Sequence, residues 1–255
     1  MKLLIDADYI VYKSCASAET EIDFGEDLIM VTSLFSDAMK AVKNELNKIK
    51  KEFFDPELIL FFSDSRNFRK DIYPNYKGHR NRKKPCGYKR VVHALAAEYQ
   101  TVIYPELEAD DTLGIYATSH DDCVIVSPDK DMRQIPGQLW DMKDEVFTIT
   151  KEEGRQWHFI QTLAGDQTDG YAGAPGYGVK TAAKLFEKEG YYWETIVEAF
   201  ESKGLTEEDA LTNARLAKIL QVEDYSYDIQ KPRRWNPAPS DHRPHTGTGV
   251  SAKED

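Results

Sequence analysis

The first half of the chain alternates short apolar runs with longer segments of helical periodicity. Four runs are typical of buried strands, and they cover residues 3–5, 58–62, 101–104 and 123–126. The longest helical pattern lies between the first two, from about residue 31 to 54, with apolar side chains three or four positions apart. Strands alternating with helices predict an α/β fold, with a mainly parallel central sheet flanked by crossover helices.

The second half of the chain has a different pattern. From about residue 151 the apolar positions are spaced as in helices, and from Lys231 onward prolines mix with Ser, Thr and Gly. We therefore expect an α/β core over residues 1–150, a helical region over 151–230 and a flexible tail over 231–255.

The charge of the chain is unevenly distributed. Its formal net charge is −11, which argues against a polyanionic partner if the charge is uniform. The segment from Arg66 to Arg90, however, has ten Lys or Arg residues and only one acid, Asp71, so it carries +9 and the rest carries −20. A basic segment within an acidic protein keeps nucleic acid open as a ligand.

The cysteines and the N-terminal residues indicate in which cellular compartment the protein is found. Three cysteines are an odd number, and their spacing matches neither a disulfide framework nor a zinc motif. The N-terminal sequence MKLLIDADY reaches an acid too early for a signal-peptide core. We expect a cytoplasmic protein that is not secreted.

Acidic residues follow the predicted strands. Asp6, Asp64 and Asp129 come at or just after strand ends, and in an open α/β sheet the carboxyl ends of the strands line one crevice. Glu108, Asp110 and Asp111 begin a predicted helix after the third strand. Together with three later acids they form a set of nine candidate ligands: Asp6, Asp64, Glu108, Asp110, Asp111, Asp129, Asp131, Asp166 and Asp169.

Each acid also has a purely structural interpretation. Glu108 to Asp111 fit the acidic first turn that a helix dipole favours, and Asp129 fits a helix N-cap. As a group, however, so many carboxylates on one edge repel one another and favour bound cations. Oxygen ligands without thiolates or paired histidines select Mg²⁺ or Mn²⁺, and two such ions would serve phosphoryl transfer.

The basic segment interleaves cations with aromatic side chains. This composition is typical of single-stranded nucleic-acid binding, in which cations contact phosphates and aromatic rings contact bases. The alternative is a solvated basic loop or a localisation signal. The candidate DNA-binding residues here are Arg69, Tyr76, Lys77, Arg80, Arg82, Lys83 and Lys84.

A glycine-rich stretch precedes a predicted helix that begins near Val179. Gly173, Gly176 and Gly178 would let the backbone approach a phosphate, next to the free N–H groups of the helix N-terminus. The spacing does not fit a Walker A loop. A phosphate clamp and an ordinary glycine-containing turn both remain open.

The order of these motifs resembles the 5′-nuclease superfamily, which includes flap endonucleases, the 5′-nuclease domains of bacterial DNA polymerases and bacteriophage 5′→3′ exonucleases. The resemblance covers about residues 1–190 and is strongest to the stand-alone phage exonucleases. Its motifs are LLIDADYIVY, FFSD, FRKDIYPNYKGHR, EADD, SPDKDMRQ, GDQTD and GAPGYGVKTAAKL. It implies a PIN-like nuclease core with a helix-hairpin-helix region at about 164–190.

The resemblance also implies roles for individual residues. Asp6, Asp64, Glu108, Asp110 and Asp111 would bind a first metal ion, and Asp129, Asp131, Asp166 and Asp169 would support a second. Lys77 and Arg80 would contact the scissile phosphate in the family's helical arch, and Tyr76 would stack on a terminal base. The hairpin from Gly173 to Thr181, including Lys180, would grip the duplex backbone with a K⁺ ion.

The implied activity is Mg²⁺-dependent hydrolysis of DNA from a 5′ end or at a 5′ flap, with 5′-phosphate products and RNA–DNA hybrids as further substrates. Two rivals are a haloacid-dehalogenase-type phosphatase, suggested by Asp6-Ala7-Asp8, and a non-catalytic DNA-binding module. A third is a toxin-type nuclease. None of the three explains the carboxylates, the basic segment and the hairpin together.

Overall fold

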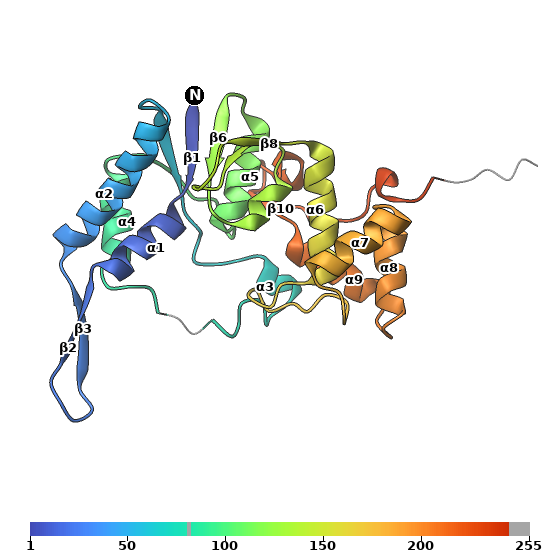
Figure 1. The fold of residues 1–255 in the computed structure, drawn as a ribbon, viewed down its shortest axis with the longest axis horizontal. Helices are drawn as coiled ribbons and strands as arrows, with labels where there is room; N and C mark the ends of the chain where they lie inside the picture. The colour runs from blue at the N-terminus through green and yellow to red at the C-terminus, as the bar shows by residue number, and fades with distance from the viewer. Residues whose placement is uncertain (81–82, 245–255) are drawn as a thin grey trace, which may run out of the picture.

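The computed structural model describes residues 1–80 and 83–244 and is built on a six-stranded sheet (Figure 1). From one edge to the other, the strands are β5 (Gln100–Val102), β4 (Glu57–Phe61), β1 (Lys2–Asp6), β6 (Cys123–Val126), β7 (Gly137–Trp140) and β8 (Phe147–Ile149). The first five are parallel and β8 is antiparallel to β7. The predicted α/β class with a mainly parallel sheet is confirmed.

The central strands are apolar because both of their faces are covered. In β1, Leu3 and Ile5 pack against one helical layer, while Leu4 packs against the other, and all three are fully buried. The first layer consists of α1 (Ala7–Ser17), α2 (Phe35–Glu52) and α4 (Tyr88–Ala96). The second is built on α5 (Ala109–Ser119) and the short helix η1 (Lys130–Gln134). All four predicted strands exist, although β5 begins and ends earlier than expected.

A two-stranded ribbon projects from the first layer beside α1 and α2 (Figure 1). Its strands are β2 (Glu19–Asp23) and β3 (Ile29–Ser33), joined through a turn in which Gly25 has a φ of +78°. The prediction of a helix from about residue 31 was therefore wrong at its start. The apolar residues before Leu34 continue the helical spacing by chance, but they belong to a β-hairpin.

The C-terminal region is mainly helical, as predicted. Its helices are α6 (Lys151–Ala164), α7 (Val179–Glu189), α8 (Trp193–Glu201) and α9 (Glu207–Ala217). They share a separate core built around Phe159, Phe186, Trp193 and Phe200. The loop from 165 to 178 joins α6 to α7 and gives the helix–loop–helix arrangement expected at about 164–190.

The prediction of a flexible tail from Lys231 is wrong for residues 231–244. After the short helix η2 (Val222–Asp224), β9 (Tyr225–Ser226) pairs with β10 (Lys231–Pro232), and η3 (Pro239–Asp241) follows. Trp235 packs against His158 and Trp193, and Arg243 forms an ion pair with Glu198. The prolines therefore shape an ordered strap over the helices. Residues 245–255 lie outside the described part.

Within residues 1–80 and 83–244, every helix is too short or too polar to cross a lipid bilayer.

Candidate active site

A cavity of about 320 Å³ opens at the carboxyl end of the parallel strands and is lined largely by acids. Its carboxylates come from four segments of the chain, and they are Asp6, Asp8, Glu108, Asp110, Asp129, Asp131 and Asp169. Six of the nine predicted ligands are among them. We call this cavity the acid pocket.

Local helix capping orients two of these carboxylates. Asp6 ends β1 and caps α1, because its Oδ1 accepts the N–H of Tyr9 at 3.2 Å while its Oδ2 accepts Ser127 Oγ at 2.9 Å. Asp129 caps η1 in the same way, accepting the N–H of Asp131 at 2.9 Å. The capping and the ligand interpretations are thus compatible, since the cap fixes the direction in which each carboxylate faces.

Mutual repulsion marks the centre of the acid pocket. Burial, together with the charges of Asp6 and Asp129, raises the pKa of Asp110 well above its usual range. Burial raises the pKa of Asp6 to about 6, and burial with the nearby Asp129 raises the pKa of Asp131 to about 7. Carboxylates that resist ionisation next to one another form a strong site for a positive charge.

Lys77 supplies part of that charge. Its Nζ forms a hydrogen-bonded ion pair with Glu108 and lies 3.6 Å from Asp169. Burial alone would raise the pKa of Glu108, but Lys77 and Arg69 lower it to about 2. The backbone of Lys77 is in the left-handed region at φ +53°, and its N–H donates to the carbonyl of Asp169 at 2.7 Å. This costly conformation holds the ammonium over the acids.

Tyr76 and Arg80 join the basic segment to the loop after α6. The Tyr76 hydroxyl lies 3.0 Å from Glu108 Oε2 and 2.8 Å from Asp169 Oδ2, so its one proton is shared between two carboxylates. Arg80 donates to Asp169 Oδ1 at 2.6 Å and to the carbonyl of Thr168 at 3.0 Å. Tyr76 is only 2% exposed, which corrects the expectation that its ring stacks on a base.

Arg69 and Asp111 are not where the sequence placed them. Arg69 is 1% exposed, and its guanidinium donates to both oxygens of Asp111, at 2.6 and 2.8 Å. Asp111 is fully buried beneath the acid pocket. The predictions of a DNA contact for Arg69 and a metal-ligand role for Asp111 are therefore wrong, because each side chain neutralises the other in the interior.

Two further acids fall outside the acid pocket. Asp64 turns toward the backbone, where its carboxylate accepts the N–H groups of Ser65 at 2.6 Å and Glu106 at 2.8 Å. Asp166 accepts the N–H of Thr168 at 2.7 Å and lies 3.3 Å from Lys130. Neither carboxylate lines the acid pocket, and each fixes the loop that carries it. Their roles as metal ligands stay predictions.

Asp8 lines the acid pocket but is absent from the predicted ligands. Its Oδ1 is hydrogen-bonded to the hydroxyl of Tyr88 and lies 3.7 Å from Lys84, while its Oδ2 accepts the N–H of Ser63 at 2.9 Å. The signal was present in the sequence, because Asp8 follows Asp6 by two positions and lies in the first turn of α1. Tyr9 and Tyr12 complete that side of the cavity.

The glycine loop separates into a buried and an exposed part. Gly173 is buried at φ +64°, and its N–H donates to Asn213 Oδ1 at 3.0 Å, so it has no donor left for a phosphate. The predicted DNA contact of Gly173 is therefore corrected to a packing role. Gly176, Gly178 and Lys180 are exposed, and exposed Thr181 caps α7 through the N–H of Gly178 at 2.8 Å.

Lys83 and Lys84 are exposed on the basic segment, and Arg82 lies outside the described residues. Across the described part of the chain, no three His, Cys, Asp or Glu side chains are already gathered as a ligand cage for one ion. In the acid pocket the reason is visible: Lys77 and Arg80 lie among the carboxylates and pair with them.

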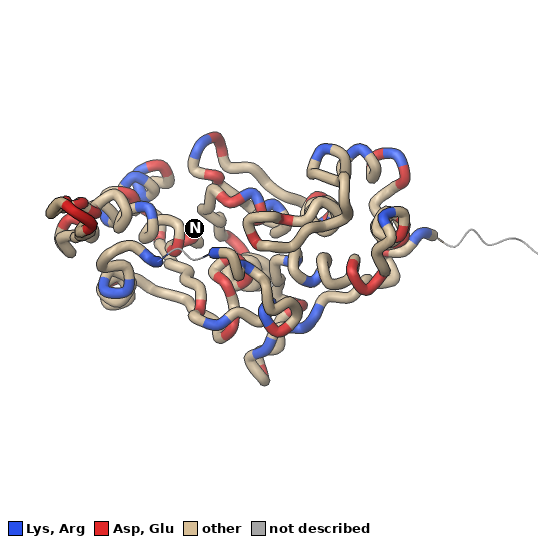
Figure 2. Tube along the Cα trace, turned by 90° about the horizontal axis from the view of Figure 1, so that it is seen from below, with Lys and Arg blue, Asp and Glu red and all other residues tan. Residues whose placement is uncertain are grey.

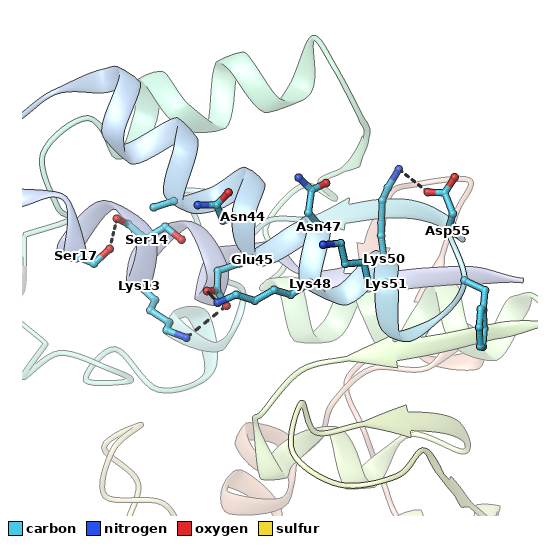
Figure 3. Close-up of a pocket in the computed structure, with 12 residues that line it drawn as sticks. Lys13, Ser14, Ser17, Asn44, Glu45, Asn47, Lys48, Lys50, Lys51 and Asp55 are labelled. Carbon is cyan, nitrogen blue, oxygen red and sulfur yellow. Dashed lines mark hydrogen bonds and ion pairs between the residues drawn. The ribbon is translucent and has the colours of Figure 1, made fainter.

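A larger cavity, of about 880 Å³, lies elsewhere, along α1 and α2 (Figure 3). Four lysines line it, but three of them are paired, and Lys13 and Lys48 are turned toward Glu45. This cavity lacks a set of converging acids, and the acid pocket is the better candidate for chemistry.

Comparisons with known proteins identify the family of this chain. Residues 1–159 match the model of the family described as "5′-3′ exonuclease, N-terminal resolvase-like domain". The exodeoxyribonuclease of Enterobacteria phage T3 is 29% identical, covering 92% of both chains, and the exonuclease of Escherichia phage T7 is 28% identical, covering 92% of this chain and 93% of that protein.

The fold has solved counterparts. The flap endonuclease D15 of bacteriophage T5, determined as a complex with DNA and metal ions, superposes with a TM-score of 0.61 at 14% identity, covering 86% of this chain and 89% of that chain. The family model spans more than half of the chain, and the phage relatives match almost all of it. The chain therefore belongs to the 5′-3′ exonuclease family and is an enzyme of that nuclease class.

Proposed function

We propose that this enzyme hydrolyses phosphodiester bonds of DNA near a 5′ end or at a 5′ flap, leaves 5′-phosphate products, and does so with two Mg²⁺ ions held by the acid pocket. The observation that carries the proposal is the convergence of seven carboxylates on one cavity at the carboxyl end of the sheet. RNA in RNA–DNA hybrids is included as a substrate of the same site.

The donor set of the acid pocket fits hard divalent cations. All of its candidate ligands are carboxylates, which suit Mg²⁺ and Mn²⁺. The raised pKa values of Asp6 and Asp110 indicate a site that gains from added positive charge. Asp6, Asp110 and Asp129 would hold such ions. When bound, two ions supply an activated water and neutralise charge on the scissile phosphate. The T5 flap endonuclease complex supports this assignment.

Lys77 and Arg80 act on the substrate in this proposal. Both are pocket-lining cations that now pair with Glu108 and Asp169, and both lie on the basic segment. A scissile phosphate in the acid pocket would be contacted by the same two groups, which orient it and stabilise the charge that develops during hydrolysis. Tyr76 keeps Glu108 and Asp169 in place from below.

Duplex binding is assigned to the exposed end of the helix–loop–helix region. Gly176 and Lys180 present backbone N–H groups and an ammonium at the N-terminus of α7, an arrangement that suits a DNA phosphate. Gly178 contributes its small size, because its own N–H is donated to Thr181 Oγ1 at 2.8 Å. The loop is connected to the acid pocket through Asp169. A K⁺ ion at this loop is part of the proposal.

The test is digestion of a 5′-labelled duplex and a matched 5′-flap substrate, with Mg²⁺ and with EDTA, followed by sizing of the products. We expect metal-dependent products released from the 5′ end, and their lengths separate exonuclease from flap cutting. Tight binding without cleavage of either substrate would instead indicate a DNA-binding module. A covalent aspartyl-phosphate on Asp6 would indicate a phosphatase.

A further inference from the structure

The β2–β3 ribbon is exposed to solvent over most of its length. Every residue from 21 to 31 is exposed, including Phe24 at 60% and Ile29 at 62%. Residues 19–33 contain five acids and no Lys or Arg. Figure 2 shows these acids together at the left end of the molecule. The ribbon thus combines apolar side chains with a strong negative charge, and the proposed nuclease chemistry uses neither.

On β2 the acidic and the apolar side chains lie on opposite faces, whereas the paired residues 29–31 of β3 are apolar on both faces. Ile22 pairs with Met30, and with Phe24 they form an apolar face, because alternate residues of a strand lie on the same side. Glu21 and Asp23 lie on the other face, opposite Val31 and Ile29. From Glu21 to Phe24 the order is acid, apolar, acid, apolar, so this edge of the ribbon presents acids on one face and apolar side chains on the other, as in a strand with one covered face.

The covering partner is missing from the described part of the chain. The ribbon is a sheet of two strands, and no third strand of residues 1–80 or 83–244 pairs with either edge. An isolated two-stranded hairpin is only marginally stable in water, and a third strand supplies the missing backbone hydrogen bonds. An uncovered apolar face next to an open strand edge is typical of strand addition.

We propose that the free edge of β2 binds an extended segment of another protein in which Lys or Arg alternates with apolar residues. In that register each cation of the added strand lies opposite Glu21 or Asp23, and its apolar side chains extend the face of Ile22 and Phe24. Cross-strand pairs of opposite charge and of apolar side chains both favour this complex.

The charge of the ribbon favours a basic protein segment over DNA and over a second copy of this chain. DNA phosphates are repelled by a segment that contains five acidic residues and no Lys or Arg. A second copy offers no matching strand, since no strand in the ranges described alternates Lys or Arg with apolar residues. A basic, extended protein segment is the complementary surface that remains.

The ribbon also contacts the basic segment near the acid pocket. Glu19 Oε1 accepts the N–H of Cys86 at 2.7 Å, and two residues later Tyr88 holds Asp8 in the acid pocket. A protein bound to the ribbon would therefore lie beside the DNA-binding side of the enzyme. This is the position from which another DNA-processing protein could hand over a substrate.

The test uses a fluorescent peptide that alternates lysine and valine, and a second peptide with the same residues in blocks. We expect the wild-type enzyme to bind the alternating peptide more tightly, and amide exchange of residues 19–23 to slow in the complex. The variants Glu21→Lys/Asp23→Lys and Ile22→Thr/Phe24→Thr should each weaken binding about tenfold. The matched control Asp121→Lys/Glu145→Lys reverses two exposed acids elsewhere and should bind as wild type.

Cleavage of a plain duplex by all three variants should equal that of the wild type, which shows that they are folded and separates this proposal from the proposed nuclease function. Equal binding of the two peptides, or equal weakening by the control variant, would overturn the proposal. It would also be overturned if the ribbon variants lost affinity for single-stranded DNA, or if they abolished a dimer seen in sedimentation, because the occupant would then be DNA or a second copy.

Discussion

The guanidinium of Arg69 binds both carboxylate oxygens of Asp111 in the interior, at 2.6 and 2.8 Å. Arg69 also donates to the carbonyls of Leu216 at 3.0 Å and Lys218 at 2.5 Å. It lies in the four-residue helix α3 (Arg69–Ile72) of the basic segment, and Asp111 lies in the first turn of α5. One buried cation thus joins the basic segment, the helix of Glu108 and the end of α9.

Breaking this pair should destabilise the whole enzyme. Arg69→Met leaves Asp111 as an uncompensated buried charge, so we expect a loss of about 3–5 kcal/mol in the free energy of unfolding, measured by urea denaturation. The double variant Arg69→Met/Asp111→Leu removes both charges and should be more stable than Arg69→Met alone. Removal of the exposed pair Lys43–Glu98 is the control and should leave the urea midpoint unchanged. Additive losses in the double variant would contradict the paired role.

Tyr76 should act through its hydroxyl and not through stacking of its ring on a base. Tyr76→Phe keeps the ring but removes the hydroxyl shared by Glu108 and Asp169, which leaves Asp169 Oδ2 without its donor at a cost of about 1–3 kcal/mol. We expect slower single-turnover cleavage with unchanged affinity for DNA. Cleavage by Tyr76→Phe at the wild-type rate, with loss only in Tyr76→Ala, would favour stacking.

Two changes in the glycine loop should have different effects. Lys180→Ala removes an exposed cation and should weaken duplex binding with a salt slope reduced by about one. Gly173→Ala should instead lower stability, because an added Cβ would lie 2.4 Å from the backbone nitrogen of Gly165 and the φ of +64° disfavours alanine. Thermal unfolding and duplex titrations at several salt concentrations measure both. An unchanged salt slope in Lys180→Ala would contradict the assignment of this loop to DNA.

Asp6 gives the metal-free enzyme an unusual pH dependence. Because burial raises the pKa of Asp6 from 3.8 to about 6, the folded state holds the proton more tightly than the unfolded state. The contribution of Asp6 to the free energy of unfolding is fully present below pH 3.8 and is lost as the pH rises through 6. At about 1.36 kcal/mol per pKa unit, the loss is about 3 kcal/mol.

Asp6→Asn should therefore be more stable than the wild type at pH 8 in EDTA, and the difference should vanish near pH 4. Buried His158, whose pKa is lowered to about 3 by burial, acts on both proteins alike and cancels in the comparison. Added Mg²⁺ at pH 8 should stabilise the wild type more than the variant. If Asp6→Asn is less stable than the wild type at pH 8, the pKa of Asp6 is not raised in the folded enzyme.

The sheet and most of the site could be predicted because their signals are local. The central parallel strands are short and mostly apolar. Asp6 ends one of them and Asp129 comes three residues after another, so the convergence of their carboxylates needed only the rule for parallel sheets. The basic segment and the glycine loop were visible from composition. The β2–β3 ribbon was missed because its apolar residues merge with those of α2.

The errors at the site share one physical cause. Sequence shows that Arg69, Tyr76 and Asp111 carry polar groups near the right motifs, but not whether those groups are buried. Arg69 and Asp111 neutralise each other across 42 positions of the chain, and Tyr76 reaches Asp169 across 93. Such distant pairings decide whether a side chain contacts substrate or supports the residues that do.

Asp110 lies at the centre of the acid pocket, so its replacement tests the central claim most directly. The measurement is single-turnover cleavage of a 5′-labelled duplex by Asp110→Asn in Mg²⁺, with DNA affinity determined in parallel. We expect cleavage to be abolished while affinity for DNA is retained, because the change removes one charged ligand and leaves the basic segment and the loop intact. Turnover at the wild-type rate would show that the acid pocket is not the site of hydrolysis.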